Sequence, residues 1–305
     1  MKIYTVFMTY DQREWLPSVL DQTDRALEFG SIDKVLIAEG GHSLKVSPRS
    51  PDGSWDYLNE RLAGNDNYKL YDAKPFRDNS VMYGQVQAPL LTHMCQDAFN
   101  NNETDEDVWI WYIHDDEFFL DPFLKNIRNY AIQAKEEGYE MIMTKQMGFA
   151  YNFKLYWSKR TCYMLFSWNK GNVWKPITTP CYPDGIQYLN KKDKIKFDAS
   201  HENTTFHFSH VKRPKRLKYR ASDLPSEIGA SAASIWYRDV YEAADLNNLD
   251  EVYRKNVHIQ GGYGFYKDSA DMGPEVMQVL NTYTGEYPYA LRNHPYKDIE
   301  DIRKI

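Results

Sequence analysis

Cysteine is scarce in this sequence. Its 305 residues include Cys95, Cys162 and Cys181, which have no paired spacing. They predict neither a disulfide framework nor a zinc site, and a reducing compartment suits them best. The N-terminal apolar run is too short for a signal peptide, and no stretch approaches the roughly 20 apolar residues of a membrane span. We therefore expect a soluble, cytoplasmic protein with no transmembrane segment.

A basic charge balance is also lacking. The net charge is −6 and the sequence pI is about 5.8, so we do not expect nucleic acid as a partner. The sequence has no P-loop, G-x-G-x-x-G, G-x-S-x-G, H-E-x-x-H or kinase motif set. Aromatic residues, in contrast, make up 15% of the chain. Aromatic faces can stack on sugar rings, which favours a carbohydrate ligand, although ordinary packing explains any single ring equally well.

Short apolar runs alternate with helical patterns in the first half of the chain. Residues 2–8 and 34–38 read as buried strands, and a helix is expected between them, with Asp11 as its cap. A strand, helix and strand in this order predict a parallel sheet. We expect an α/β fold with a mostly parallel central sheet flanked by helices. The catalytic domain would span residues 1–220, and a C-terminal helical extension and tail would span residues 221–305.

The most informative stretch is an apolar run that ends in charged residues. Residues 108–113, V-W-I-W-Y-I, predict a buried central strand, and H-D-D-E at 114–117 follows it directly. In open α/β sheets, ligands bind just beyond the carboxyl ends of the strands. Adjacent carboxylates repel one another, and a divalent cation such as Mg²⁺ or Mn²⁺ relieves that repulsion. The stretch therefore predicts a metal site; the alternative, an acidic turn that caps the next helix, explains only Asp121.

A second group of polar side chains lies in residues 206–220, F-H-F-S-H-V-K-R-P-K-R-L-K-Y-R. Strand alternation places His207 and Ser209 on one face and His210 on the other. The lysines and arginines that follow could neutralise phosphate oxygens, whereas a solvated basic helix face explains the cations alone. Acids, histidine and cations together predict a metal–diphosphate site.

Polar residues also follow the first two expected strands. Thr9, Tyr10 and Asp11 come after the first strand, and Glu39 comes after the second, before two glycines. A carboxylate at such a strand end can accept hydrogen bonds from a nucleotide base or ribose. For Glu39, a capping or exposed group is the alternative.

These motifs together resemble the nucleotide-sugar glycosyltransferases of the GT-A fold, close to family 2 and its bacterial and viral members. V-F-M-T-Y-D-Q-R-E-W-L-P-S-V-L is similar to the family's first strand and helix, and K-V-L-I-A-E-G-G to its second strand with a base-contacting acid. I-H-D-D-E-F-F resembles its D-x-D-E metal motif, and H-F-S-H-V-K-R-P-K-R-L-K its late histidine segment. The resemblance covers most of residues 1–220, and T-G-E-Y-P-Y-A-L-R-N-H-P-Y resembles a C-terminal signature of the family.

The resemblance implies transfer of a sugar from a nucleotide diphosphate sugar, UDP- or GDP-linked, to a glycan or other hydroxyl acceptor, with inversion. Asp116 and His207 would hold Mn²⁺ or Mg²⁺. His114 stands where the family has an aspartate, a change that some relatives tolerate. The residues expected around the nucleotide and its phosphates, outside the metal ligands, are Thr9, Tyr10, Asp11, Glu39, His114, Asp115, Arg213, Arg216 and Lys218.

The resemblance also implies a carboxylate that deprotonates the acceptor. Asp184, in C-Y-P-D-G, is the candidate, and an ordinary Pro-Asp-Gly turn is the alternative. Trp168, Trp174 and Tyr182 could stack on the acceptor sugar or pack in the core. Two other functions stay open. One is a sugar-1-phosphate nucleotidyltransferase, although the N-terminal segment lacks the glycine-rich loop that it needs. The other is a non-catalytic carbohydrate-binding protein of the same fold.

Overall fold

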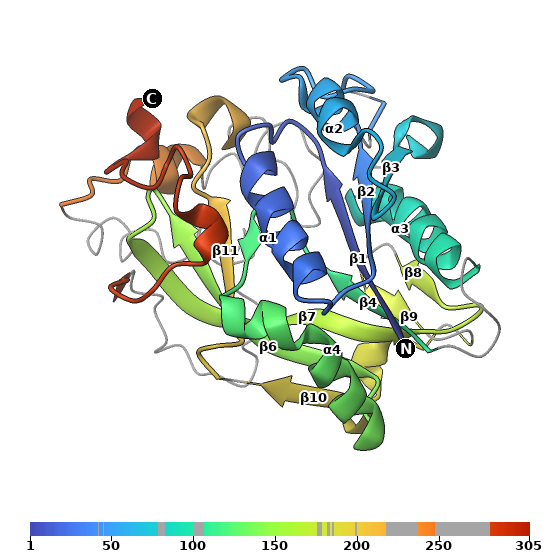
Figure 1. Cartoon of the computed structure of the whole chain (residues 1–305). Coiled ribbons are helices and arrows are strands. Elements are labelled where there is room, and N and C mark those ends of the chain that lie inside the picture. Colours follow the sequence, from blue (N-terminus) through green and yellow to red (C-terminus); the bar gives the residue numbers. More distant parts are fainter. Residues whose placement is uncertain are drawn as a thin grey trace. The chain divides into compact units, whose positions relative to one another are not determined.

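The structure is a computed structural model of the chain (Figure 1). It describes all residues except 42, 45, 79–82, 101–106, 176–178, 182, 183, 185, 199, 218–236 and 248–280. The chain forms two compact units, each assembled from separate segments. The first unit contains residues 1–146, 160–206 and 287–294, and the second contains residues 147–159, 207–286 and 295–305.

Parallel strands form the centre of the sheet in the first unit. β1 (Lys2–Thr9) pairs with β2 (Lys34–Glu39) and with β4 (Val108–Tyr112), and β2 pairs with β3 (Tyr68–Asp72). All three pairings are parallel. Strands that are buried on both faces have continuous apolar runs, which is why β1, β2 and β4 could be predicted from the sequence.

Helices cover both faces of this sheet (Figure 1). They are α1 (Leu16–Glu28), α2 (Ser54–Leu62), α3 (Tyr83–Asn100) and α4 (Asp121–Glu136). On one face, Tyr4 and Val6 of β1 share a core cluster with Leu91 of α3. On the other face, the ring of Trp111 in β4 lies 6.0 Å from that of Phe123 in α4. The prediction of an α/β fold with a mostly parallel sheet flanked by helices is confirmed.

Two predicted helix starts are wrong. α1 begins at Leu16 rather than after Asp11, because Asp11 has a left-handed backbone with φ of 55°. Trp15 is the N-cap of α1, and it makes no side-chain capping bond. Asp121 is the first residue of α4 rather than its cap. Its carboxylate instead forms an ion pair with Arg25 of α1, which joins two helices on the same face of the sheet.

The sheet continues beyond β4. The remaining strands are β5 (Glu117–Phe118), β6 (Met141–Ala150), β7 (Leu155–Trp168), β8 (Val173–Lys175), β9 (Thr179–Cys181), β10 (Ile195–Asp198), β11 (Thr205–His210) and β12 (Asn281–Thr282). In the first unit, β7 pairs with β4 antiparallel, and β10 pairs with β6 in parallel. β8 and β9 form a separate antiparallel ribbon. The strands β6, β7 and β11 each have residues in both units.

Aromatic rings build the core of the second unit. Phe208 of β11 stacks on Phe149 of β6 with ring centroids 4.5 Å apart, and it also lies 4.5 Å from Phe153. Tyr151 stacks on Tyr241 at 4.7 Å. Large rings bury much apolar area per residue, so this cluster fixes the part of β11 that carries the predicted histidines.

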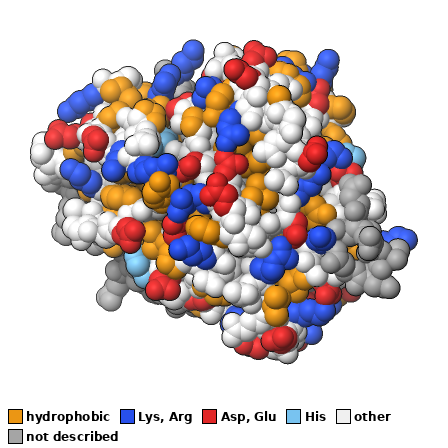
Figure 2. Space-filling model, viewed as in Figure 1, with side chains coloured by type: hydrophobic (Ala, Val, Ile, Leu, Met, Phe, Trp, Pro, Cys, Tyr) orange, Lys and Arg blue, Asp and Glu red, His pale blue; other side chains and the backbone are white. Residues whose placement is uncertain are grey.

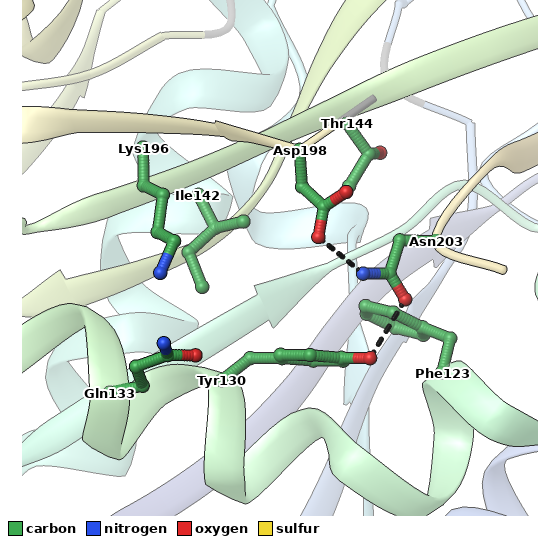
Figure 3. Close-up of a pocket in the computed structure, with 8 residues that line it drawn as sticks. All are labelled: Phe123, Tyr130, Gln133, Ile142, Thr144, Lys196, Asp198 and Asn203. Carbon is green, nitrogen blue, oxygen red and sulfur yellow. Dashed lines mark hydrogen bonds between the residues drawn. The ribbon is translucent and has the colours of Figure 1, made fainter. Parts of the chain in front are cut away.

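A cavity of about 100 Å³ lies between α4 and the strands β6 and β10 in the first unit (Figure 3). Asn203 joins its walls, because its amide donates to Asp198 and its carbonyl accepts from the Tyr130 hydroxyl at 3.0 Å. Lys196 donates to Glu137 at 2.7 Å. Since these polar groups bond to one another, the network connects α4 to the β10 edge of the sheet.

Trp168 and Trp174 pack in the core of the first unit. Their side chains are 0% and 4% exposed, respectively. The indole N–H of Trp174 donates to Cys95 Sγ at 3.4 Å, and its ring lies 4.8 Å from that of Tyr112. Stacking on a sugar requires an open ring face, so of the two alternatives that the sequence left open, packing in the core applies to both tryptophans. Tyr182 lies outside the described residues.

The predicted domain boundary at residue 220 lies outside the described residues. Within residues 237–247 and 281–305, which are described, the helical segments are a π-helix over Tyr237–Glu242 and 3-10 turns over Tyr289–Leu291 and Ile302–Lys304. The boundary and the helical extension therefore stay predictions.

In the part of the chain that is described, no helix is both long and apolar enough to cross a bilayer. On the face shown in Figure 2, acidic and basic side chains are interspersed with apolar ones.

Candidate metal and nucleotide site

The acidic turn lies directly after β4, as the sequence predicts. The backbone N–H of Ile113 donates to the carbonyl of Val6 at 3.2 Å, which keeps the end of β4 beside β1. Beyond it, Asp115 and Asp116 are 7% and 3% exposed. The side chain of His114, in contrast, is 48% exposed. An imidazole open to solvent therefore lies next to nearly buried carboxylates at the carboxyl end of a central strand.

Glu117 connects the residues of this turn. It is 1% exposed, and its Oε2 accepts from the backbone N–H of His114 at 2.9 Å. Its Oε1 lies 3.0 Å from Nδ1 of the same histidine and accepts from Gln146 Nε2 at 2.9 Å. The Glu117 carboxylate therefore contacts both the backbone and the ring of His114.

Gln22 of α1 fixes the other side of the turn. Its Nε2 donates to the carbonyl of Glu117 at 3.0 Å, and its Oε1 accepts from the N–H of Phe119 at 2.9 Å. A side-chain amide therefore pairs with the backbone on both sides of Phe118, as a neighbouring strand would. Gln22 and Gln146 could not be predicted from the sequence, because a single glutamine in a helix or strand carries no signal of such a role.

The charge of the turn acts on His114. Desolvation alone would lower the pKa of this histidine, but the carboxylates of Glu117, Asp116 and Asp115 raise it to about 9. The other ring nitrogen, Nε2, lies 3.1 Å from the hydroxyl of Tyr112. A cation that binds this ring must therefore displace a proton, as is general for histidine ligands.

The donor set of the turn fits a divalent cation. His114 and Asp116 each offer a ligand atom within 4.8 Å of the other. A cation there would offset the repulsion between the clustered carboxylates. The resemblance directs His114 or Asp115 toward the ribose or a water, and this role stays a prediction. The ring of His114 lies beside Asp116.

The predicted residues of the basic segment belong to the second unit. His207 lies in β11 and is half-buried. Arg213 is exposed, and its Nε donates to the Tyr296 hydroxyl at 3.0 Å. Arg216 is half-buried, and Lys218 lies outside the described residues. The strand is present as predicted, and the phosphate-binding role of these cations stays a prediction.

The residues at the end of β1 are mostly buried. Thr9 and Tyr10 are 1% and 9% exposed, and Thr9 lies beside Glu39 in the strand register. The backbone N–H of Asp11 donates to Ser50 Oγ at 2.8 Å. This bond connects the turn after β1 to the segment 46–53, which follows β2.

Glu39 is fully buried at the end of β2. Its Oε1 accepts from the backbone N–H of Ser50 at 2.9 Å, and Arg49 Nη1 lies 3.6 Å from its Oε2. Burial raises the pKa of Glu39, against the lowering effects of Ser50 and Arg49. The segment 46–53 therefore covers this carboxylate, and a nucleotide can reach Glu39 only if Arg49 and Ser50 move.

Asp184 lies in an exposed turn of the first unit. Its Oδ1 accepts from the backbone N–H of Ile186 at 2.9 Å. Aspartate side chains commonly make this bond in turns, so the contact agrees with the structural alternative. The role of Asp184 as a catalytic base stays a prediction.

No protein-family model and no curated protein matches this chain. Among solved structures, S. aureus TarS is similar over 86% of this chain and 44% of its own, with 9% identity and a TM-score of 0.43. TarS 1-349 in complex with UDP is similar over 87% of this chain and 73% of its own, with 10% identity and a TM-score of 0.44. Glucosyl-3-phosphoglycerate synthase from Mycobacterium tuberculosis, in complex with Mn²⁺, UDP and glucosyl-3-phosphoglycerate, is similar over 48% of this chain and 44% of its own. Its identity is 12% and its TM-score is 0.29. This chain thus spans less than half of the full TarS chain.

Proposed function

We propose that this protein is a metal-dependent glycosyltransferase of the GT-A type that moves a sugar from a nucleotide diphosphate sugar to an acceptor hydroxyl. The observation that carries this proposal is the acidic turn after β4, where His114 and Asp116 lie at a distance that one cation can bridge. Nucleotides bind at the carboxyl edge of parallel sheets. Thr9 ends the neighbouring strand β1 at that edge, and Glu39 ends β2, where a nucleotide would have to displace Arg49 and Ser50 to reach it.

Asp116 is the first metal ligand in this proposal, and His207 is a further one, as the motif resemblance implies. Mn²⁺ suits a site with imidazole and carboxylate ligands better than Mg²⁺ does. When bound, the cation supplies a Lewis acid that neutralises the diphosphate leaving group. UDP- and GDP-sugars are the donors that we expect, and a glycan or another hydroxyl compound is the acceptor.

The remaining steps belong to side chains of this protein. Arg213, Arg216 and Lys218 donate hydrogen bonds to the phosphate oxygens as negative charge develops on them. Asp184 accepts the proton of the acceptor hydroxyl. The acceptor oxygen then bonds to the anomeric carbon on the face opposite the departing diphosphate, which inverts that carbon. Asp115 lies next to the metal ligand, and we expect it to bind the ribose or a water.

A thermal-shift screen of UDP, GDP, CDP and dTDP, each with and without Mn²⁺, tests this proposal. A ligand that binds only the folded state stabilises it by about 2.7 kcal/mol at a concentration of 100 times its Kd. We expect one nucleotide to raise the melting temperature, and only when Mn²⁺ is present. That nucleotide would also identify the class of donor.

One other outcome of the screen and two further assays separate the alternatives. If none of the nucleotides shifts the melting temperature, the glycosyltransferase proposal fails and a carbohydrate-binding protein becomes the better explanation. If a shift and turnover require a nucleoside triphosphate with a sugar phosphate, the protein is a nucleotidyltransferase. Hydrolysis of a nucleotide sugar in the presence of Mn²⁺ would separate both enzymes from the binding protein.

A further inference from the structure

The carboxylate of Glu117 is held against His114. Both of its carboxylate oxygens face His114, one through the backbone N–H at 2.9 Å and the other through ring Nδ1 at 3.0 Å. At 1% exposure, the side chain is too buried to meet a ligand from solvent. A carboxylate in this position can act only through the residues that it holds.

We infer that Glu117 is a positioning residue that orients His114 as a ligand of the metal, so that Nε2 faces the cation. This inference rests on the proposed metal site. A hydrogen bond from Nδ1 to a carboxylate fixes the tautomer and the ring orientation of a histidine, and it makes the other nitrogen a stronger ligand. His114 is thereby assigned to the metal rather than to the ribose. The cation would replace the Tyr112 hydroxyl as the partner of Nε2.

The surroundings of Glu117 hold it in this role. Gln146 donates to Oε1 at 2.9 Å, and Gln22 donates to its backbone carbonyl at 3.0 Å. Both glutamines are buried, at 8% and 0% exposure. The carboxylate therefore cannot swing toward solvent without breaking bonds to two buried amides, and the distance between Asp116 and the ring of His114 stays fixed.

The test is a double-mutant cycle with Mn²⁺ alone as the probe. The dissociation constant of Mn²⁺ is measured from the electron paramagnetic resonance signal of the free ion, for the full chain and for Glu117→Gln, His114→Ala and the double variant. Glu117→Gln keeps the size of the side chain but removes its charge. We expect it to weaken Mn²⁺ binding by about 10- to 100-fold. In the His114→Ala background, the same change should have no further effect, because Glu117 acts through the ring.

Asp301→Asn is the matched control. Asp301 is also a buried carboxylate, 4% exposed, and it pairs with Arg303 at 2.7 Å. This variant should lose stability without weakening Mn²⁺ binding. If Glu117→Gln does not fold, Gln146→Leu probes the same carboxylate, and its weaker effect on Mn²⁺ binding should also vanish without His114.

Two results would overturn the inference, and they are distinguishable. If the unmodified protein binds Mn²⁺ but Glu117→Gln binds it equally well, or weakens binding equally with and without His114, Glu117 does not position the histidine and the proposed function survives. If the unmodified protein does not bind Mn²⁺, the inference and the proposed metal site both fail.

Discussion

The guanidinium of Arg49 donates two hydrogen bonds to the carboxylate of Asp72, from Nη1 to Oδ1 at 2.9 Å and from Nη2 to Oδ2 at 2.7 Å. The same guanidinium lies 3.3 Å above the ring of Trp55, the second residue of α2. Arg49 follows β2, and Asp72 ends β3, so this pair holds the segment 46–53 over the carboxyl edge of the sheet. Both contacts require a planar group with paired donors, and a lysine side chain does not have such a group.

Arg49→Lys should therefore loosen the segment 46–53. We expect the free energy of unfolding to fall by about 1 kcal/mol, because the pair is partly exposed and its charges are screened by water. Urea denaturation measures this change. The matched control is Arg292→Lys, in which the arginine also lies over a ring, that of Tyr289 at 3.5 Å, but reaches Asp21 through one bond of 2.9 Å. An equal loss in both variants would show that the paired geometry at Asp72 adds nothing.

His294 should make the protein sensitive to acid. It is 4% exposed, and its ring lies 4.1 Å from that of Trp15. Burial lowers the pKa of His294 to about 3, although a hydrogen bond with the backbone of Glu14 acts in the opposite direction. The histidine of the unfolded chain has a pKa of about 6.5. The unfolded state therefore binds a proton that the folded state rejects between pH 6.5 and 3.

This difference in proton binding predicts the direction of the pH effect. The contribution of His294 to stability is complete above pH 6.5 and is lost as the pH falls, by about 1.4 kcal/mol per pH unit. His294→Phe should reduce that slope between pH 6.5 and 4, measured by urea denaturation at several pH values. His201→Gln, a change at an exposed histidine, should keep the original slope. The same slope for His294→Phe and the unmodified protein would contradict the prediction.

Asp116→Ala should abolish the Mn²⁺-dependent thermal shift by the nucleotide and reduce sugar transfer to the background rate. The fold should survive, because the change removes one of three carboxylates that repel each other. Asp121→Asn is the control, since Asp121 follows in the same chain segment but pairs with Arg25. Turnover with an unchanged metal requirement in Asp116→Ala would rule out this residue as a ligand.

Asp184→Asn should distinguish a catalytic role of Asp184 from a structural role in the turn after β9. Asparagine can still accept from the N–H of Ile186, so the turn should persist. If Asp184 is the base, kcat falls by roughly 10²- to 10⁴-fold with little change in KM for the donor. Asp193→Asn, at an exposed residue of a 3-10 turn, serves as the comparison. Unchanged kcat would leave Asp184 with a structural role alone.

Asn203→Ala should destabilise the first unit. It would remove the partner of both Asp198 and Tyr130, and Asn203 is itself only 5% exposed. Loss of a buried hydrogen-bond partner costs about 1–3 kcal/mol. Asn129→Ala removes an exposed bond to Asn126 on the same helix and should cost much less. Equal unfolding free energies for the two variants would show that the network in Figure 3 does not hold α4.

The strands at the centre of the sheet could be predicted because they are buried on both faces. The continuous apolar runs of β1, β2 and β4 have no other stable location, and the polar residues that end them must lie at one edge. Helix starts were harder to predict. Aspartate is a common helix cap, but the bond between the backbone N–H of Asp11 and Ser50 Oγ holds Asp11 in a turn instead.

The sequence by itself determined the α/β class, the parallel pairing and the position of the acidic turn, because apolar periodicity and chain order are local properties. Only the tertiary structure decided what each carboxylate does. Glu117 accepts hydrogen bonds from the backbone of His114 and from the side chain of Gln146, which belongs to β6. Likewise, Glu39 is covered by Ser50, eleven residues further along the chain. The bonds to Gln146 and Ser50 join segments that are separated along the chain, and no local pattern of residues encodes them.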